Sequence, residues 1–192
     1  MKKLSLILVV AVSAFLFAFT VKDASVWTLD KNHAKLGFTI THLMVSDVDG
    51  LFSKFDAKIT SAKPDFSDAV FELSADVNSV NTDNEKRDAH LKSADFFDVA
   101  KYPTITFKST SIQSLGNQKY NLMGNLTMHG VTKPVTLNAV IRQAISPMTK
   151  APVAGFKVTG KIKRTDFGVG SYPAAILSEE VEINANGEFA KK

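Results

Sequence analysis

The stretch Ala69-Val-Phe-Glu-Leu-Ser-Ala-Asp-Val77 decides the fold class of this chain. Every second residue from Phe71 to Val77 is apolar, and the residues between them are polar or acidic. A period of two, with one apolar and one polar face, is typical of a half-buried antiparallel strand. The stretch therefore predicts a sheet with one dry face and one wet face.

The same alternation recurs on both sides of this stretch. We predict further strands at residues 27–29, 35–40, 51–60, 104–114, 119–128, 135–145, 153–164 and 180–189, and turns at residues 47–50 and 129–134. About eight strands joined by short loops predict an all-β fold, an eight-stranded antiparallel barrel that is closed or flattened. A two-sheet sandwich of the immunoglobulin kind is the alternative, although its Cys–Trp–Cys spacing is absent.

One segment of the chain does not alternate. From Asp83 to Leu91 it contains no Gly, Pro or Val, and most of its residues are fair helix formers or good helix caps. Pro103 biases Tyr102 toward an extended conformation, so the next strand is expected after it. We therefore predict a short helical crossover at residues 84–98, seated on an end or a gap of the sheet.

The amino terminus has the pattern of an export signal. Two lysines precede an apolar run from Leu4 to Phe19, which is shorter than the roughly 20 residues that a membrane span needs. We predict a signal peptide at residues 1–20, cleaved after Thr20, and a single domain at residues 21–192. An uncleaved amino-terminal anchor is the alternative.

The composition limits the classes of partner. The chain has 192 residues, no cysteine and a formal net charge of +4, which falls to +2 when Lys2 and Lys3 leave with the signal peptide. No basic stripe is visible, so nucleic acid is not an expected partner. Without disulfides, an exported fold depends on burial and strand pairing, which suits a barrel without unpaired edges.

The predicted inner faces carry small residues among large ones. These are Ala57, Ala75, Gly124, Ala139, Gly160 and Ala185. A barrel of about eight strands is either packed solid or holds one small ligand, so the small residues either taper the core or leave room in it. A ligand in such a space would meet apolar walls.

The residues that carry chemistry form no recognisable catalytic or metal motif. No pair of the four histidines has a metal-ligand spacing, and no serine lies in a G-x-S-x-G turn. We therefore predict neither a metal site nor a cofactor. Arg87, Asp88 and His90 are the densest polar cluster. Either Arg87 and His90 contact a ligand head group at the mouth of a pocket, or Arg87 forms an ion pair that fixes the crossover to the barrel rim.

Several runs of residues together form a specific pattern. The longest is Arg87-Asp-Ala-His-Leu-Lys-Ser-Ala-Asp-Phe-Phe-Asp98, followed by Tyr102-Pro-Thr-Ile-Thr-Phe107. The others are residues 27–30, 38–42, 48–52, 79–82, 124–135 and 164–168. In content and in order, these runs resemble the YceI-like family of exported bacterial proteins, and together they span most of the predicted domain.

The resemblance implies a lipocalin-like barrel with an elongated apolar pocket that binds a polyisoprenoid or an isoprenoid quinone in the periplasm. Polar contacts to a head group are expected from His42, Arg87 and His90. The expected apolar lining is Phe38, Ile40, Phe52, Phe71, Leu73, Phe96, Phe97, Phe107, Leu122, Leu126, Val158 and Ile162.

The leading hypothesis is thus a lipid-binding protein rather than an enzyme, with transient membrane contact and a homodimer left open. The first alternative is an enzyme for a small hydrophobic substrate, with His42, His90 and Asp88 as acid–base groups. The second is a ligand-free, stress-related structural protein with a filled interior.

Overall fold

The structure, a computed structural model, describes residues 23–192. The signal peptide predicted at residues 1–20 lies outside the described residues. The strands are β1 (Ser25–His42), β2 (Ser46–Phe52), β3 (Phe55–Ser61), β4 (Val70–Asp76), β5 (Val80–Asn81), β6 (Thr104–Gly116), β7 (Lys119–Met128), β8 (Val131–Ile145), β9 (Pro152–Lys163) and β10 (Leu177–Lys191). The helical segments are η1 (Val77–Ser79), α1 (Glu85–Lys92) and η2 (Arg164–Phe167).

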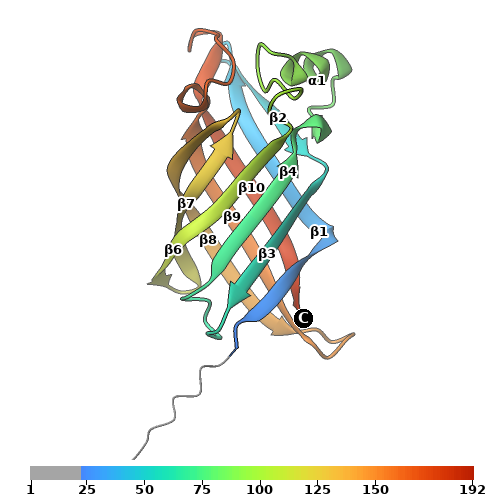
Figure 1. Ribbon diagram of the computed structural model, residues 1–192, viewed down its shortest axis with the longest axis vertical. Helices are drawn as coiled ribbons and strands as arrows, with labels where there is room; N and C mark the ends of the chain where they lie inside the picture. Colours follow the sequence, from blue (N-terminus) through green and yellow to red (C-terminus); the bar gives the residue numbers. More distant parts are fainter. Residues whose placement is uncertain (1–22) are drawn as a thin grey trace, which may run out of the picture.

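The strands close into an antiparallel barrel (Figure 1). Each strand from β6 to β10 pairs with the next, β4 lies between β3 and β6, and β10 pairs back onto β1. Because β10 occupies one edge of β1, the segments β2 and β3 share the other edge, one after the other. The wall therefore has eight positions, which confirms the eight-stranded antiparallel barrel and excludes the sandwich.

The strand predicted at residues 51–60 is divided into β2 and β3. At the break, the Ser53 N–H donates to the Ser79 carbonyl at 3.1 Å, and the Lys54 N–H donates to Ser79 Oγ at 3.0 Å. These bonds replace ladder bonds to β1. The ladder between β1 and β3 stops at Thr28–Lys58, and that between β1 and β2 resumes only at Gly37–Leu51. We call this interruption the wall seam.

Beside the seam, β1 is one strand where the sequence predicts two. Its pairing with β10 shifts between Asp30 and Ala34, so residues 31–33 form a bulge that separates the two alternating segments. An exposed ion pair between Lys31 Nζ and Asp56 Oδ2, 2.9 Å apart, joins the bulge to β3 across the seam.

Two predicted turns differ from the structure. Residues 47–50 lie within β2, and the chain turns earlier, at Leu43–Val45. The turn predicted at residues 129–134 contains only His129 and Gly130, both at positive φ, so that β8 starts at Val131. Tight turns with residues at positive φ match the twist of the flanking strands. The β1–β2 and β7–β8 hairpins can therefore pair directly from the turn onward.

Helix α1 lies over one end of the barrel, and it is shorter than the predicted crossover at residues 84–98. Asn84 caps its start by accepting a hydrogen bond from the Arg87 N–H. The helix ends at Lys92, because Ser93 is extended and its Oγ donates to the His90 carbonyl. Residues 93–98 continue as turns, and no described helix is long and apolar enough to cross a membrane.

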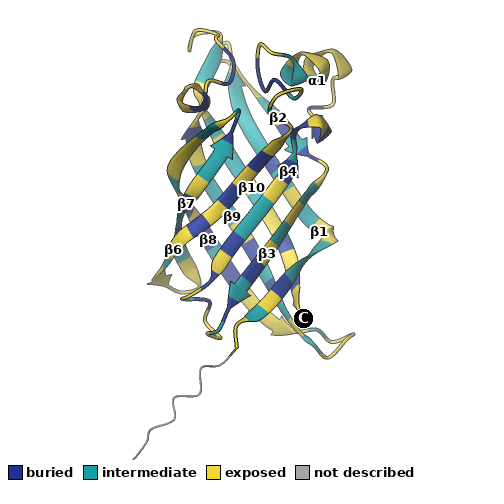
Figure 2. Ribbon diagram, in the orientation of Figure 1, coloured by how far each residue is buried: buried dark blue, intermediate teal, exposed yellow. Residues whose placement is uncertain are grey.

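The core is divided along the barrel axis into two clusters. Buried and exposed residues alternate along the strands, as the period of two predicts (Figure 2). One cluster centres on Phe66, Phe71, Phe156 and Ile59. The other lies under α1 and η2 and includes Phe52, Phe96, Phe97, Val77 and Phe167.

Candidate functional site

Two apolar cavities lie inside the barrel. The mouth cavity, about 370 Å³ in volume, lies under α1 and the loop after η2. The inner cavity, about 150 Å³, lies deeper among the strands. Phe38, Phe52, Ile162 and Ile183 line both, so the two cavities are adjoining parts of one site. Its walls are almost entirely apolar, as in sites for greasy ligands.

The end of the barrel opposite α1 is filled with aromatic rings. The Phe156 ring packs against Phe66, Phe71 and Phe189 with centroid distances of 5.3, 5.2 and 5.1 Å. Trp27 packs on Phe66 at 5.1 Å. The rings are packed in mutual contact, and Phe66 and Phe156 are only 1% and 5% exposed. The site is therefore closed at this end.

The small inner residues serve both of the roles proposed for them. The Phe107 ring occupies the space beside Gly124, and the Leu137 side chain occupies that beside Gly160. Ala75 and Ala139 are buried in packed core. Ala57 and Ala185, in contrast, line the inner cavity and give it width.

Every residue predicted to bind ligand lines at least one of the two cavities. Both cavities are lined by Phe38, Phe52 and Ile162. The mouth cavity is also lined by Ile40, His42, Arg87, His90, Phe96 and Phe97. The inner cavity is also lined by Phe71, Leu73, Phe107, Leu122, Leu126 and Val158. Alternation alone places the members that lie on strands, because an inward strand position in a barrel faces the same space on every strand. Arg87, His90, Phe96 and Phe97 lie in α1 and the turns after it, where that rule does not apply. That the predicted residues touch a ligand stays a prediction.

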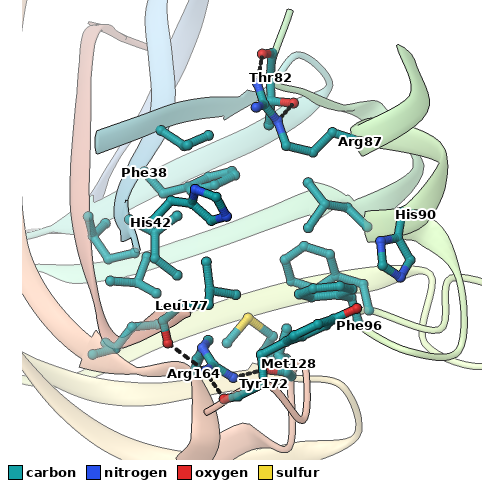
Figure 3. Close-up of a pocket in the computed structure, with 18 of the residues that line it drawn as sticks. Phe38, His42, Thr82, Arg87, His90, Phe96, Met128, Arg164, Tyr172 and Leu177 are labelled. Carbon is teal, nitrogen blue, oxygen red and sulfur yellow. Dashed lines mark hydrogen bonds between the residues drawn. The ribbon is translucent and has the colours of Figure 1, made fainter. Parts of the chain in front are cut away.

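Polar side chains lie at the mouth cavity (Figure 3). Arg87 Nε donates to Thr82 Oγ1 at 2.8 Å, and its Nη2 donates to the Thr82 carbonyl at 2.6 Å. The Thr82 hydroxyl in turn donates to Asp88 Oδ1 at 2.5 Å. Arg87 thus fixes α1 to the preceding loop by hydrogen bonds, and it also faces the cavity.

The proposed acid–base set is not assembled. Asp88 Oδ1 accepts from both the hydroxyl and the N–H of Thr82, while His90 Nε2 lies 3.2 Å from the exposed Asp95. In the described part of the chain, no hydrogen bond joins His42, His90 and Asp88 to one another. The three residues of the enzyme hypothesis therefore form no hydrogen-bonded relay in this structure.

Arg164 is the main residue of the site that the sequence did not single out, although it begins one of the family-like runs. Only 3% of it is exposed. Its guanidinium donates to five backbone carbonyls, those of Val169, Gly170, Tyr172, Leu177 and Ser178, at 2.5–3.1 Å. Burial lowers the pKa of Arg164, and the nearby charge of Glu179 opposes that shift.

Tyr172 and Phe96 also shape the mouth cavity. Their rings stack with centroids 5.6 Å apart, and the His90 ring meets the edge of Phe96 at 5.0 Å. Phe97 packs edge-on against Phe52 at 5.9 Å. The two adjacent phenylalanines thus both line the mouth cavity.

A cluster of metal-type side chains lies away from the cavities. Among the described residues, Asp30, His33 and Glu188 bring one ligand atom each to within 4.8 Å of one another. Asp30 Oδ2 and His33 Nδ1 are 2.8 Å apart and form an ion pair when the ring is protonated. The pair lies on the bulge of β1, at the surface.

Comparisons with known proteins agree with this geometry. The sequence pattern of the YceI-like domain matches residues 27–189. The protein YceI of Salmonella newport is 38% identical over 173 residues, which cover 89% of this chain and 90% of the relative. The Campylobacter jejuni YCEI protein is 34% identical and superposes with a TM-score of 0.72 over 79% of this chain and 90% of its own.

Two further solved structures share the fold. BcnA of Burkholderia cenocepacia is 26% identical, with a TM-score of 0.76 over 83% of this chain and 98% of its own. A polyisoprenoid-binding domain from Saccharophagus degradans, 16% identical, superposes with a TM-score of 0.67 over 86% of this chain and 98% of its own. The match to the family pattern covers nearly all the described residues, and the chain therefore belongs to the YceI-like family.

Proposed function

We propose that this protein binds one isoprenoid lipid, a polyisoprenoid or an isoprenoid quinone, and sequesters or carries it in the barrel. The observation that carries the proposal is the adjoining pair of apolar cavities, closed by aromatic rings at one end and bordered by polar groups at the other. This shape suits a molecule with a long apolar chain and a small polar head.

The energetics favour such a ligand. Each methylene that moves from water into an apolar site contributes about 0.8 kcal/mol. The chain needs no hydrogen bonds, and only the head does. In the proposed orientation, the chain extends past Phe38 and Phe52 into the inner cavity. The head stays near Arg87, His90 and His42 at the mouth.

The relatives support the proposal without deciding the ligand. The Saccharophagus degradans domain, which shares the fold, is a polyisoprenoid-binding domain. The family points to a binding protein rather than an enzyme. An isoprenoid chain with a quinone or another head group remains our inference for this chain.

We further propose that the protein works in the periplasm after export by residues 1–20. The support is the sequence of that segment, two lysines and an apolar run. Fractionation of the source cells, with the intact mass of the recovered protein, tests this. We expect the periplasmic fraction to contain a protein whose mass is that of the chain cleaved after Thr20. An unprocessed protein in the cytoplasmic fraction would contradict export.

Native mass spectrometry of protein purified from its own cells tests the ligand. We expect a bound lipid that dissociates as a prenyl compound, and stripped protein should take up added prenyl quinones. Recovery of no lipid, together with no binding of added prenyl quinones, would defeat the proposal.

A matched pair of substitutions on β10 locates the site. Ala185→Phe fills the inner cavity, whereas Asn184→Phe adds the same ring to the exposed face of the same strand. We expect Ala185→Phe to weaken binding of long prenyl chains at least tenfold and Asn184→Phe to bind like the wild type. Thermal unfolding of both variants checks that the added ring has not unfolded the barrel, since overpacking costs about 1–3 kcal/mol.

A further inference from the structure

The turn between β1 and β2 presents three consecutive apolar residues to solvent. Leu43, Met44 and Val45 are 52%, 67% and 83% exposed. Single exposed apolar residues are common on protein surfaces, but a run of three at a hairpin tip is not explained by packing.

The backbone of this turn makes the choice of residues more unusual. Leu43 and Met44 have φ values of 51° and 57°, and the Val45 N–H donates to the His42 carbonyl at 3.2 Å. Two successive residues at positive φ strongly favour Asn and Gly. The β6–β7 hairpin also has two successive residues at positive φ, 51° and 63°, and there the residues are the polar Asn117 and Gln118. At the β1–β2 turn, the chain thus departs from both the conformational preference and the preference for polar surface.

The turn between β1 and β2 lies beside the mouth cavity. The Leu43 N–H donates to the Ile176 carbonyl at 2.9 Å, and His42 and Ile176 both line the mouth cavity. Ile176 and Tyr172, which also lines that cavity, are themselves exposed. The apolar surface of the turn therefore continues into the lining of the site at its open end.

We propose that Leu43, Met44 and Val45, together with Tyr172 and Ile176, form a docking tip that inserts reversibly into the surface of a lipid bilayer. The inference rests on the proposed function, because an isoprenoid lipid is dissolved in a bilayer and must leave it to enter the barrel. A docked tip places the mouth against the bilayer, so that the chain passes between two apolar environments without exposure to water. So few inserted side chains give weak, reversible binding rather than a permanent anchor.

The double variant Leu43→Asn, Met44→Gly tests this proposal, because it removes the apolar tip and supplies the residues that the backbone prefers. Unilamellar vesicles of phosphatidylethanolamine and phosphatidylglycerol, with and without a prenyl quinone, are the probe. We expect the variant to unfold at the same or a higher temperature and to bind detergent-dispersed quinone like the wild type. We expect it to extract quinone from vesicles at least tenfold more slowly.

Met148→Asn is the matched control. Met148 is 90% exposed in the loop between β8 and β9, and it does not line the mouth cavity. Its replacement should leave the rate of extraction unchanged. Equal slowing by both variants, or no slowing by the double variant, would overturn the docking tip.

A second measurement does not depend on the quinone. Because the chain has no cysteine, Val45→Cys and Met148→Cys each give one site for an environment-sensitive fluorophore. Quinone-free vesicles should shift the emission of the first to the blue and leave the second unchanged. This result would support docking even if the protein bound no prenyl lipid, so the two proposals fail separately. If the emission of the Val45→Cys label shifted with protein concentration in the absence of vesicles, the docking tip would be contacting a second copy of the protein. That result would contradict the proposal.

Discussion

At the scale of single residues, Arg164 shows how a buried charge can organise the site. Its five donors bind five carbonyls of the segment from Val169 to Ser178, and within residues 23–192 no carboxylate is among its hydrogen-bond partners. A guanidinium has five donors in a fixed plane, which a lysine cannot reproduce. Arg164 therefore holds the loop that carries Tyr172 and Ile176 at the mouth.

Replacement of Arg164 by methionine should destabilise the barrel by about 3 kcal/mol, because buried carbonyls lose their donors. For a domain of this size, that corresponds to a fall in melting temperature of about 6–12 °C. Arg164→Lys should recover only a small part of the loss. The control is Arg142→Met, at an exposed position. An equal fall in the melting temperatures of both variants would contradict the role assigned to Arg164.

Inward-facing residues could be predicted from the sequence, because one rule, alternation, places them. Phe38 and Ile162 follow that rule, and they lie at the junction of the two cavities. Arg164 could not be found in the same way. It lies in η2, where no period applies, and its partners are backbone atoms that any residue type would supply.

At the scale of elements, α1 is held mainly by polar contacts, with the partly buried Leu91 packed against the core beneath it. None of its residues is buried. Thr82, only 6% exposed, connects the helix to the barrel by accepting from Arg87 and donating to Asp88. A segment with few apolar contacts opens locally at low free energy, which suits a cover over a site.

Thr82→Val removes the hydroxyl and keeps the shape of the side chain. We expect amide hydrogen exchange from Arg87 to Lys92 to become about tenfold faster, since roughly 1.4 kcal/mol of local stability is a factor of ten, and hydrogen bonds of this kind contribute about that much. The melting temperature should change little. The exposed Thr106→Val on β6 is the control. Unchanged exchange in α1 would show that Thr82 does not hold the cover.

The bulge of β1 carries the clearest pH-sensitive contact. The hydrogen bond to Asp30 raises the pKa of His33, and the charges of Asp30 and Glu188 add to the effect. The same hydrogen bond, with one from the Asn32 N–H, lowers the pKa of Asp30. The stabilising contribution of His33 is therefore present below its unfolded pKa of about 6.5 and is lost as the pH rises through the raised value. That of Asp30 is lost as the pH falls through its lowered value.

NMR titration of the His33 ring tests this contact. The midpoint should lie above the ordinary histidine value, and Asp30→Asn should move it down toward that value. Asp47→Asn, on β2, should leave the midpoint unchanged. A wild-type midpoint at or below the ordinary value would show that the contact does not form in solution.

The elements themselves were only partly predictable. The period of two located most of the strands, yet it could not reveal the division between β2 and β3. That division depends on Ser79, a residue about 25 positions away whose hydroxyl and carbonyl replace the ladder bonds of Ser53 and Lys54. A contact between distant segments leaves no mark on local alternation.

At the scale of the whole molecule, a ligand that binds only the folded barrel must stabilise it. A prenyl quinone at about 100 times its dissociation constant should add about 2.7 kcal/mol, and therefore raise the melting temperature by about 5–11 °C. Differential scanning calorimetry with matched detergent measures the shift. The Ala185→Phe variant should show little shift, and an equal shift in both would place the ligand outside the inner cavity.

The wall seam gives the barrel a property that a fully paired one lacks. A closed sheet has a fixed circumference, because every strand is hydrogen-bonded to two neighbours. Between Thr28 and Gly37, β1 has no ladder partner on the side of β2 and β3, beside Leu36, Phe52 and Phe55 of the inner cavity. The exposed ion pair that crosses this interval contributes little. The wall can therefore widen at this height without breaking ladder bonds between β1 and its neighbours. Under the proposed function, this interval gives the barrel room for isoprenoid chains of different thickness.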